Sequence, residues 1–323
     1  MTPVIAPERL EGERRFLYGL GYRLTGSTAD AEDIVQDTFA RVLAHPPPDL
    51  ARPLRPYLVR IAVNLGRDRY RRRRRAPYVG PWLPWPLAGE GDGGTEHAEL
   101  EPRASTEDGP EERYSAHESV RFAFLLALEA LSPNERAVLV LRDVLDYSVR
   151  ETAEALGLKE PHVKTLHLRA RRAIQGHPTA APRARAKEHT DAALFQFLEA
   201  LSSGDAARIE GLLASEVKLR SDGGGHFKAA LRVVQGPAKV TRFFLKLGAK
   251  FGPTSTVTPL TVNGQLAVLI EHEERAPPAV GMKRSGIAPR TLLMLDLDGD
   301  GRVRDVHLVL APEKLDRLLG PRP

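Results

Sequence analysis

The sequence contains no cysteine. That absence excludes disulfide bonds, thiolate zinc sites and cysteine nucleophiles, and it fits a reducing cytoplasm. Aromatic residues make up only 6%, with two tryptophans. No apolar run approaches the ~20 residues of a membrane-spanning helix. Residues 1–15 include three glutamates and no apolar run typical of a signal peptide. We therefore expect a cytoplasmic protein without membrane contact.

Charge is distributed unevenly along the 323 residues. The formal net charge is only +5, but residues 54–75 contain nine Arg and one Asp, a net charge of +8. Residues 89–112 follow with nine acidic residues and one Arg, a net charge of −8. Such segregation suggests a basic binding surface followed by an acidic tether. The length and the 42% hydrophobic content predict two or three domains with cores.

Residues 54–75 have the apolar spacing of an amphipathic helix. Its apolar side is formed by Leu54, Tyr57, Leu58, Ile61, Ala62 and Leu65. Its other side begins with Arg55 and continues with Arg60, Asn64, Arg67, Asp68, Arg71 and Arg72. A charge run is usually a solvated face, but such faces mix Lys, Glu and Arg. Arginine binds phosphate bidentately and stacks on bases, so this nearly pure Arg face favours a nucleic-acid partner.

An acidic helix is expected before the basic one, over residues 29–44, with a capping box formed by Ser27 and Asp30. Its exposed side contains Asp30, Glu32, Asp33, Gln36 and Asp37. Acids in the first turn of a helix can simply complement its dipole. That explanation does not extend to Asp37, so a basic protein partner is the alternative.

A helix-turn-helix is expected in residues 148–174, with the turn at Gly157. In this motif the second helix enters the major groove, although short helical hairpins also occur as scaffolds. The second helix, residues 161–174, is basic, which favours DNA binding. The candidate DNA contacts of this segment are Lys159, His162, Lys164, Thr165, His167, Arg169 and Arg172.

The remaining segments differ in composition from these helical ones. Both tryptophans lie in the WLPWPL segment, residues 82–87, which we expect to dock on a surface rather than act as an inert spacer. Residues 89–112 and 176–185 are expected to be linkers. Beyond them, helices are predicted at residues 194–201, 209–213 and 238–250, and strands at residues 217–220, 227–233, 254–262, 265–271, 290–296 and 303–310. Helices followed by strands indicate an α+β domain.

Three segments resemble a bacterial sigma factor of the extracytoplasmic-function (ECF) group, which has sigma domains two and four. They are GSTADAEDIVQDTFARV (residues 26–42), YLVRIAVNLGRDRYRRRRR (57–75) and LSPNERAVLVLRDVLDYSVRETAEALGL (131–158). The motifs WLPWPL (82–87), DGGG (222–225) and APEKL (311–315) resemble the subgroup with a fused SnoaL-like domain. That subgroup usually has an acidic residue at the position of Trp85 and Asn at that of Ala311.

The resemblance implies a multidomain fold: two all-α DNA-binding modules, the second a helix-turn-helix, followed by an α+β SnoaL-like domain with a curved mixed sheet. The implied boundaries are 1–77 for sigma domain two, 78–112 for an acidic linker, 113–176 for sigma domain four, 177–187 for a second linker and 188–323 for the SnoaL-like domain.

The resemblance also implies roles for single residues. The polymerase core, through the clamp helices of its largest subunit, would bind Asp30, Asp33, Gln36 and Asp37. The −10 promoter element would be melted and recognised by Asn64, Arg67, Asp68 and Arg71, and the −35 element by the helix of residues 161–174.

An intramolecular contact is predicted from the three subgroup motifs. A Gly triplet allows the backbone to approach another surface closely, and the linker aromatics supply rigid apolar area. We expect the C-terminal domain to pack on the linker and hold the two DNA-binding modules in a fixed relation. The residues of this contact would be Trp82, Leu83, Pro84, Trp85, Asp222, Gly223, Gly224, Gly225, Pro312, Lys314 and Leu315.

No catalytic, metal or cofactor site is predicted. Asp222, His226 and His272 could act as acid–base groups, but no motif connects them. The DLDGDG run from Asp296 imitates a calcium loop, yet its twelfth position is His307 instead of a bidentate Glu. The chain is therefore expected to initiate transcription at promoters as a polymerase subunit. The alternatives are a one-component DNA-binding regulator that senses a small ligand in its C-terminal domain, and an enzyme tethered to DNA.

Overall fold

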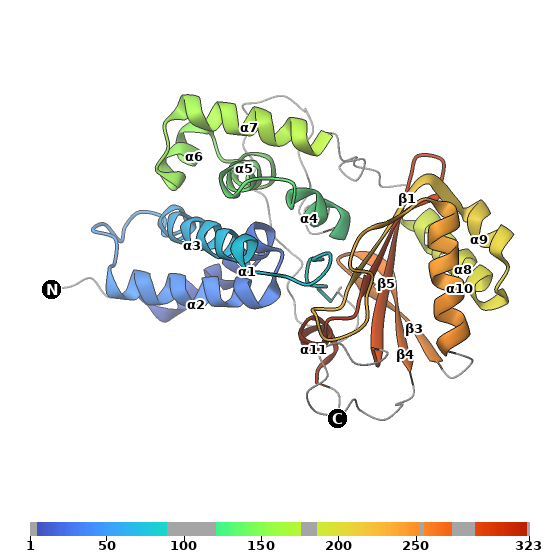
Figure 1. Cartoon of the computed structure of the whole chain (residues 1–323). Helices are drawn as coiled ribbons and strands as arrows, with labels where there is room; N and C mark the ends of the chain where they lie inside the picture. Colours follow the sequence, from blue (N-terminus) through green and yellow to red (C-terminus); the bar gives the residue numbers. More distant parts are fainter. Residues whose placement is uncertain (1–4, 89–120, 176–185, 252–254, 273–287, 322–323) are drawn as a thin grey trace. The chain divides into compact units, whose positions relative to one another are not determined.

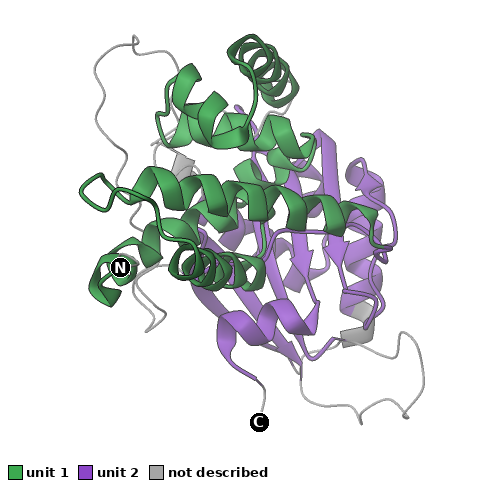
Figure 2. Cartoon of the chain, turned by 90° about the vertical axis from the view of Figure 1, so that its left-hand side faces the viewer, with its two compact units in different colours: residues 1–76, 95–182 green, residues 77–94, 183–323 purple. Residues whose placement is uncertain are grey.

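A computed structural model of the chain describes residues 5–88, 121–175, 186–251, 255–272 and 288–321. The chain forms two compact units (Figure 2). Unit 1 comprises Met1–Ala76 and Thr95–Pro182, and unit 2 comprises Pro77–Gly94 and Arg183–Pro323. The segment directly after the basic helix therefore belongs to the same unit as the C-terminal half. None of the described helices is long and apolar enough to cross a membrane.

In the part of unit 1 that the structure describes, all the regular elements are helices (Figure 1). Its elements are α1 (Pro7–Thr25), α2 (Thr28–Ala44), α3 (Arg55–Arg75), α4 (Phe122–Leu128), α5 (Pro133–Leu139), the π-helical turn η2 (Val140–Val144), α6 (Val149–Leu156) and α7 (Glu160–Gln175). The expected acidic helix, basic helix and helix-turn-helix are confirmed as α2, α3 and α6–α7. Helix α4 begins two residues after the end of the undescribed range 89–120.

Local sequence signals explain where these helices begin and end. The Ser27 side chain accepts a hydrogen bond from the Asp30 backbone N–H, and Ser132 and Ser148 form complete capping boxes with Glu135 and Glu151. These contacts satisfy backbone donors that have no partner within the helix. Gly157, with φ 63°, ends α6 in the left-handed conformation that a helix-turn-helix turn requires.

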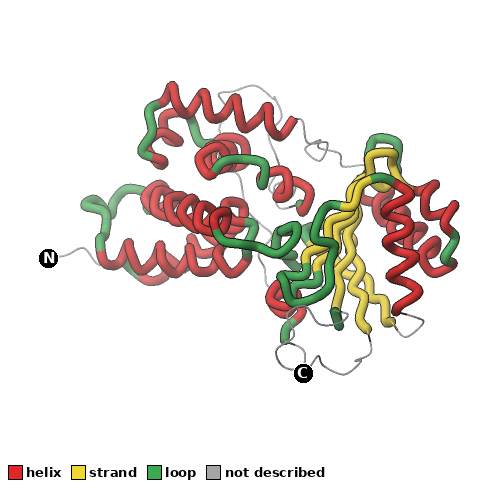
Figure 3. Tube along the Cα trace, in the orientation of Figure 1, coloured by secondary structure: helices red, strands yellow, loops and turns green. Residues whose placement is uncertain are grey.

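Unit 2 combines helices with a six-stranded mixed sheet (Figure 3). The strand order is β2-β1-β6-β5-β4-β3; β1 and β6 are parallel and the other neighbours are antiparallel. The elements are α8 (Ala186–Ser203), α9 (Ala206–Leu212), β1 (Leu213–Asp222), β2 (Val234–Gln235), α10 (Pro237–Phe251), β3 (Ser255–Val262), β4 (Gln265–His272), β5 (Arg290–Leu297), β6 (Val303–Val309) and α11 (Pro312–Leu319).

The two faces of this sheet have different neighbours. Leu219, Leu293 and Leu308 belong to a buried apolar core shared with α8, α9 and α10, so that these helices cover one face (Figures 1 and 3). Side chains alternate between the two faces along a strand, so the residues next to these leucines in sequence face the opposite side of the sheet. That opposite face contains the polar residues of the central strands, namely Arg220, Asp222, Asp296, Asp305 and His307.

The prediction of a strand over residues 227–233 was wrong. Only Val234 and Gln235 pair with β1, and Leu231 and Val233 are 52% and 43% exposed. The backbone turns after β1, where His226 and Phe227 donate to the Gly223 carbonyl, and this turn displaces the following residues from the sheet. Alternating apolar residues alone do not supply a pairing partner. Helix α11 was not expected. Turns at Asn263-Gly264 and Asp298–Gly301 connect β3 to β4 and β5 to β6.

Candidate nucleic-acid interface

The basic helix α3 buries a wider apolar side than its spacing predicted. Val59, Val63 and Tyr70 are buried in addition to the expected Leu58, Ala62 and Leu65, whereas Ile61 is only half-buried. Gly66 allows α1 to approach, because a Cβ there would lie 2.8 Å from Leu24 Cδ1. The arginines of α3 are divided between those that contact protein and those that face solvent.

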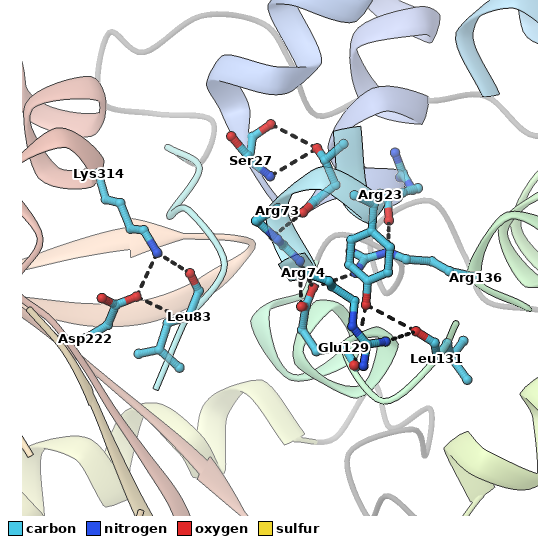
Figure 4. Close-up of polar contacts among 12 residues, drawn as sticks. Arg23, Ser27, Arg73, Arg74, Leu83, Glu129, Leu131, Arg136, Asp222 and Lys314 are labelled. Carbon is cyan, nitrogen blue, oxygen red and sulfur yellow. Dashed lines mark hydrogen bonds and ion pairs between the residues drawn. The ribbon is translucent and has the colours of Figure 1, made fainter. Parts of the chain in front are cut away.

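Arg73 belongs to the arginines that hold unit 1 together. Its guanidinium binds the Glu129 carboxylate at 2.5–2.7 Å and the Thr25 carbonyl, and Arg136 binds the same carboxylate at 2.5 Å (Figure 4). Both guanidiniums lie over the Tyr70 ring, 4.9 and 4.7 Å from its centroid. Burial, together with the neighbouring charge of Arg136, lowers the pKa of Arg73 despite the attraction of Glu129. Arg73 is therefore a structural residue.

Other residues of α3 remain on the solvent side. Arg60, Asp68 and Arg72 are exposed, and Arg71 is half-buried and pairs with Asp68 at 2.8 Å. These four residues belong to the predicted DNA-binding set, and their placement leaves a basic surface along α3. Surface ion pairs such as Arg71–Asp68 contribute little to stability, so they do not compete strongly with a phosphate partner.

Asn64 and Arg67, predicted to contact promoter DNA, instead bind the first helix of the helix-turn-helix in this structure. Asn64 Nδ2 donates to the Ala155 carbonyl at 3.5 Å, and Arg67 Nη1 donates to the Leu156 carbonyl at 3.2 Å. Both carbonyls lie at the end of α6, where helix carbonyls lack partners within the helix. Burial lowers the pKa of Arg67, and the nearby Arg71 lowers it further.

Three of the four acidic residues of α2 converge on Arg69 of α3. Its guanidinium lies 3.4 Å from Asp30, 2.8 Å from Asp33 and 2.7 Å from Asp37. Burial opposes the charge of Arg69, but the three carboxylates outweigh it and raise its pKa. Three negative charges against one positive charge leave the cluster with a net charge of −2. Asp33 and the neighbouring Gln36 remain exposed, so the cluster presents an acidic face to solvent.

Helix α7 places most of its predicted DNA-binding residues in solvent. Val163, Leu166, Ala170 and Ile174 are buried. The exposed members of the predicted set are Lys159, His162, Lys164, Thr165, Arg169 and Arg172.

His167 of the predicted set differs, because its Nε2 lies 2.6 Å from the buried Asp143 of η2. Arg171 binds the same carboxylate at 2.9 Å. Burial raises the pKa of Asp143, but these two partners outweigh it, so the pKa lies below its ordinary value.

Unit 2 contains a separate contact, centred on a buried ion pair between Asp222 and Lys314 (Figure 4). Lys314 Nζ lies 2.7 Å from Asp222 Oδ2 and also donates to the Leu83 carbonyl. The Leu83 N–H donates to Asp222 Oδ2 at 2.7 Å, and the Tyr78 hydroxyl donates to Oδ1 at 2.6 Å. Both backbone groups of Leu83 are therefore bound by one ion pair.

The other predicted residues of this contact lie around the pair. Trp82 stacks under Lys314, with 4.5 Å from Nζ to the ring centroid, while Pro84 and Leu315 are buried and Trp85 and Pro312 are half-buried. Glycine is required after Asp222: a Cβ on Gly223 would lie 2.9 Å from the Phe227 carbonyl oxygen, and Gly224 and Gly225 have φ of 61° and 83°.

The sequence interpretation missed Asn263 as a linker contact. Its backbone N–H donates to the Leu87 carbonyl at 2.8 Å, and its side-chain oxygen accepts from the Leu87 N–H at 3.0 Å. In a sequence, an Asn-Gly pair between two strand-like runs usually marks a hairpin turn and nothing more. A strand-to-strand turn that also binds a remote segment has no local signal in the sequence.

Other polar residues of the central strands form hydrogen bonds and ion pairs with one another. His307 Nε2 lies 2.9 Å from Asp296, and Arg220 and Arg304 bind Asp305 at 2.6 and 2.9 Å. Burial raises the pKa of Asp305, but His307 and the two arginines outweigh it and lower the pKa. Within the described ranges, no group of His, Asp and Glu side chains is arranged to hold a metal ion.

Comparison with known proteins agrees with this arrangement of two helical modules. The family model of Sigma-70 region 2 matches residues 10–76, and that of Sigma-70, region 4 matches residues 121–174. The ECF RNA polymerase sigma factor SigJ of Mycobacterium tuberculosis is 34% identical over 245 residues, covering 75% of this chain and 73% of SigJ. The probable ECF RNA polymerase sigma factor SigI of the same organism is 27% identical over 324 residues, covering 98% and 96%.

A solved structure extends the likeness to nearly the whole chain. The crystal structure of M. tuberculosis SigJ aligns with a TM-score of 0.68 and 26% identity, covering 96% of this chain and 98% of that chain. The helices and mixed sheet of unit 2 fit the same SnoaL-like arrangement. With both sigma regions matched and this similarity to SigJ, the chain belongs to the extracytoplasmic-function family of RNA polymerase sigma factors, which direct bacterial polymerase to promoters.

Proposed function

We propose that the acidic face of α2 is the surface that binds the clamp helices of the largest polymerase subunit. The observation that supports this is the convergence of Asp30, Asp33 and Asp37 on Arg69. One half-buried guanidinium holds three carboxylates in a defined array with net charge −2, next to the exposed Gln36. Such an array suits a basic protein surface, and fixing the side chains beforehand reduces the entropy lost on binding.

The basic surfaces of α3 and α7 are proposed to bind the promoter. Arg60, Asp68, Arg71 and Arg72 lie on the solvent side of α3, with Asn64 and Arg67 toward α6. On this proposal Asn64 and Arg67 leave their carbonyl partners on α6 when the −10 element binds. The exposed polar residues of α7 contact the −35 element, as expected for the second helix of a helix-turn-helix. His167 takes part only if it leaves Asp143.

Unit 2 is proposed to be a regulatory module without catalytic activity. The layer between its sheet and helices is filled by apolar side chains, including Phe197 and Phe244, whose rings stack edge to face at 5.3 Å. Asp222, the candidate acid or base, is committed to Leu83, Tyr78 and Lys314. Regulation would act through these contacts with the linker. The linker follows α3 directly in the chain and joins the two DNA-binding modules.

Run-off transcription with purified bacterial core polymerase tests the polymerase surface. Asp33→Lys should reduce promoter-dependent transcript and core affinity by about tenfold or more, which corresponds to about 1.4 kcal/mol. Asp49→Lys is a matched control, because the Asp33 and Asp49 side chains are 55% and 53% exposed and the charge change is identical. Losing the Asp33–Arg69 pair should change the free energy of unfolding by at most about 1 kcal/mol. A folded Asp33→Lys variant with wild-type core affinity would contradict the proposal.

A further inference from the structure

One large apolar side chain lies within the basic surface of α7. Leu168 is 52% exposed. At 100° per residue it lies nearly opposite the buried stripe of Val163, Leu166, Ala170 and Ile174. Its neighbours one turn away on the same face are Lys164, Thr165 and Arg172, all exposed. Leu168 is therefore at the centre of the surface that a helix-turn-helix presents to DNA.

The orientation of α7 about its own axis is fixed by contacts along one flank of the helix. Asp143, whose side chain is 4% exposed, binds both His167 and Arg171. With these two residues engaged on one flank and the apolar stripe packed below, the helix cannot turn Leu168 toward the protein core. Thr165 uses its hydroxyl to bind the Pro161 carbonyl at 3.0 Å.

The chemistry of the major groove identifies what such a side chain can contact. Base edges there present hydrogen-bond donors and acceptors, and the C5-methyl group of thymine is the apolar feature among them. The surrounding Lys164, Arg169 and Arg172 can bind phosphates and bring the helix into the groove, but phosphate contacts do not distinguish sequences. A leucine in their midst adds no electrostatic attraction, so its contribution is to specificity.

We propose that Leu168 recognises a thymine of the −35 element by packing against its C5-methyl group. This inference rests on the proposed function of α7 as the helix that contacts the −35 element. It adds a specificity-determining residue and predicts a thymine at a fixed position of the recognised sequence. A single methyl contact is worth about fourfold in affinity, from the transfer free energy of a buried methyl group.

The test uses the full-length chain bound to core polymerase and promoter duplexes selected from a random library. Each thymine of the selected −35 element is replaced in turn by deoxyuridine, which lacks only the C5-methyl group. We expect one replacement to weaken wild-type promoter binding by about fourfold. The Leu168→Ala holoenzyme should bind the thymine and deoxyuridine duplexes equally. Its unfolding midpoint and core affinity should match those of the wild type, because Leu168 is exposed.

Val257→Ala is the control for loss of exposed apolar area. Val257 is 51% exposed on β3 of unit 2, and its replacement should leave the discrimination between thymine and deoxyuridine intact. The inference is overturned if wild-type holoenzyme is indifferent to every replacement, or if Leu168→Ala retains the discrimination. It is also overturned if Leu168→Ala lowers core affinity, since Leu168 would then contact polymerase. In these cases promoter selection persists and the proposed function stands, whereas failure to select any promoter sequence would overturn both.

Discussion

Replacing Lys314 by methionine is the sharpest test of the contact between the linker and the C-terminal unit. Methionine keeps most of the volume and removes the charge that faces Asp222 at 2.7 Å. The two side chains are 1% and 0% exposed, so the Asp222 carboxylate would remain buried without its counter-charge. Breaking a buried ion pair by removing one partner costs about 3–5 kcal/mol.

Three donors to Asp222 would survive in the Lys314→Met variant: the Tyr78 hydroxyl and the backbone N–H groups of Leu83 and Gly224. Because these hydrogen bonds still stabilise the carboxylate, we expect the free energy of unfolding to fall by about 3 kcal/mol, the lower end of that range. Adding Asp222→Asn removes the uncompensated charge, so the double variant should be more stable than Lys314→Met alone. Contacting residues commonly show such non-additivity, by about 0.5–3 kcal/mol.

Tryptophan fluorescence during urea unfolding is the assay, because both tryptophans of the chain, Trp82 and Trp85, lie in the linker. We expect Lys314→Met to shift the linker transition to lower urea and to alter native Trp emission. Lys239→Met is the control, since Lys239 is exposed on α10, whose buried side packs on the opposite face of the sheet. A Lys314→Met transition that coincides with that of the wild type would refute the reasoning.

Two further predictions concern unit 1. Arg71→Ala and Arg72→Ala should each weaken holoenzyme binding to promoter and flatten the log–log salt slope by about one, with little dependence on sequence; an unchanged slope would assign them to a solvated face. Asp143→Asn should destabilise the helix-turn-helix above pH 3.8, the ordinary pKa of an aspartate. Because the folded pKa of Asp143 is lower, its stabilisation is complete above that value and disappears as the pH falls through the folded pKa. Thermal melts between pH 2.5 and 6, followed by helical circular dichroism, should show the wild type and the Asn variant converging at the acid end, and a constant difference would contradict this.

The helices of unit 1 could be predicted from sequence because their signals are local. Ser132 and Ser148 cap helices through residues three positions away, and Gly157 ends α6 through its own backbone angle. Such interactions depend on neighbours in the chain, so a short window of sequence contains both partners. The strand prediction at residues 227–233 failed for the complementary reason. A strand needs a partner from elsewhere, and the turn after Asp222 removes this segment from β1.

Only tertiary packing decided which of the candidate site residues are structural and which face solvent. Arg71 and Arg73 are indistinguishable in an arginine run, yet Arg73 binds Glu129, 56 positions away, while Arg71 pairs locally. The linker contact is the extreme case, because Lys314 binds the carbonyl of Leu83 across 231 positions. The sequence motifs marked both segments but not the hydrogen bonds between them. Periodicity specifies which side of an element is apolar, whereas the partner of a buried charge depends on which distant groups folding brings within a few ångströms.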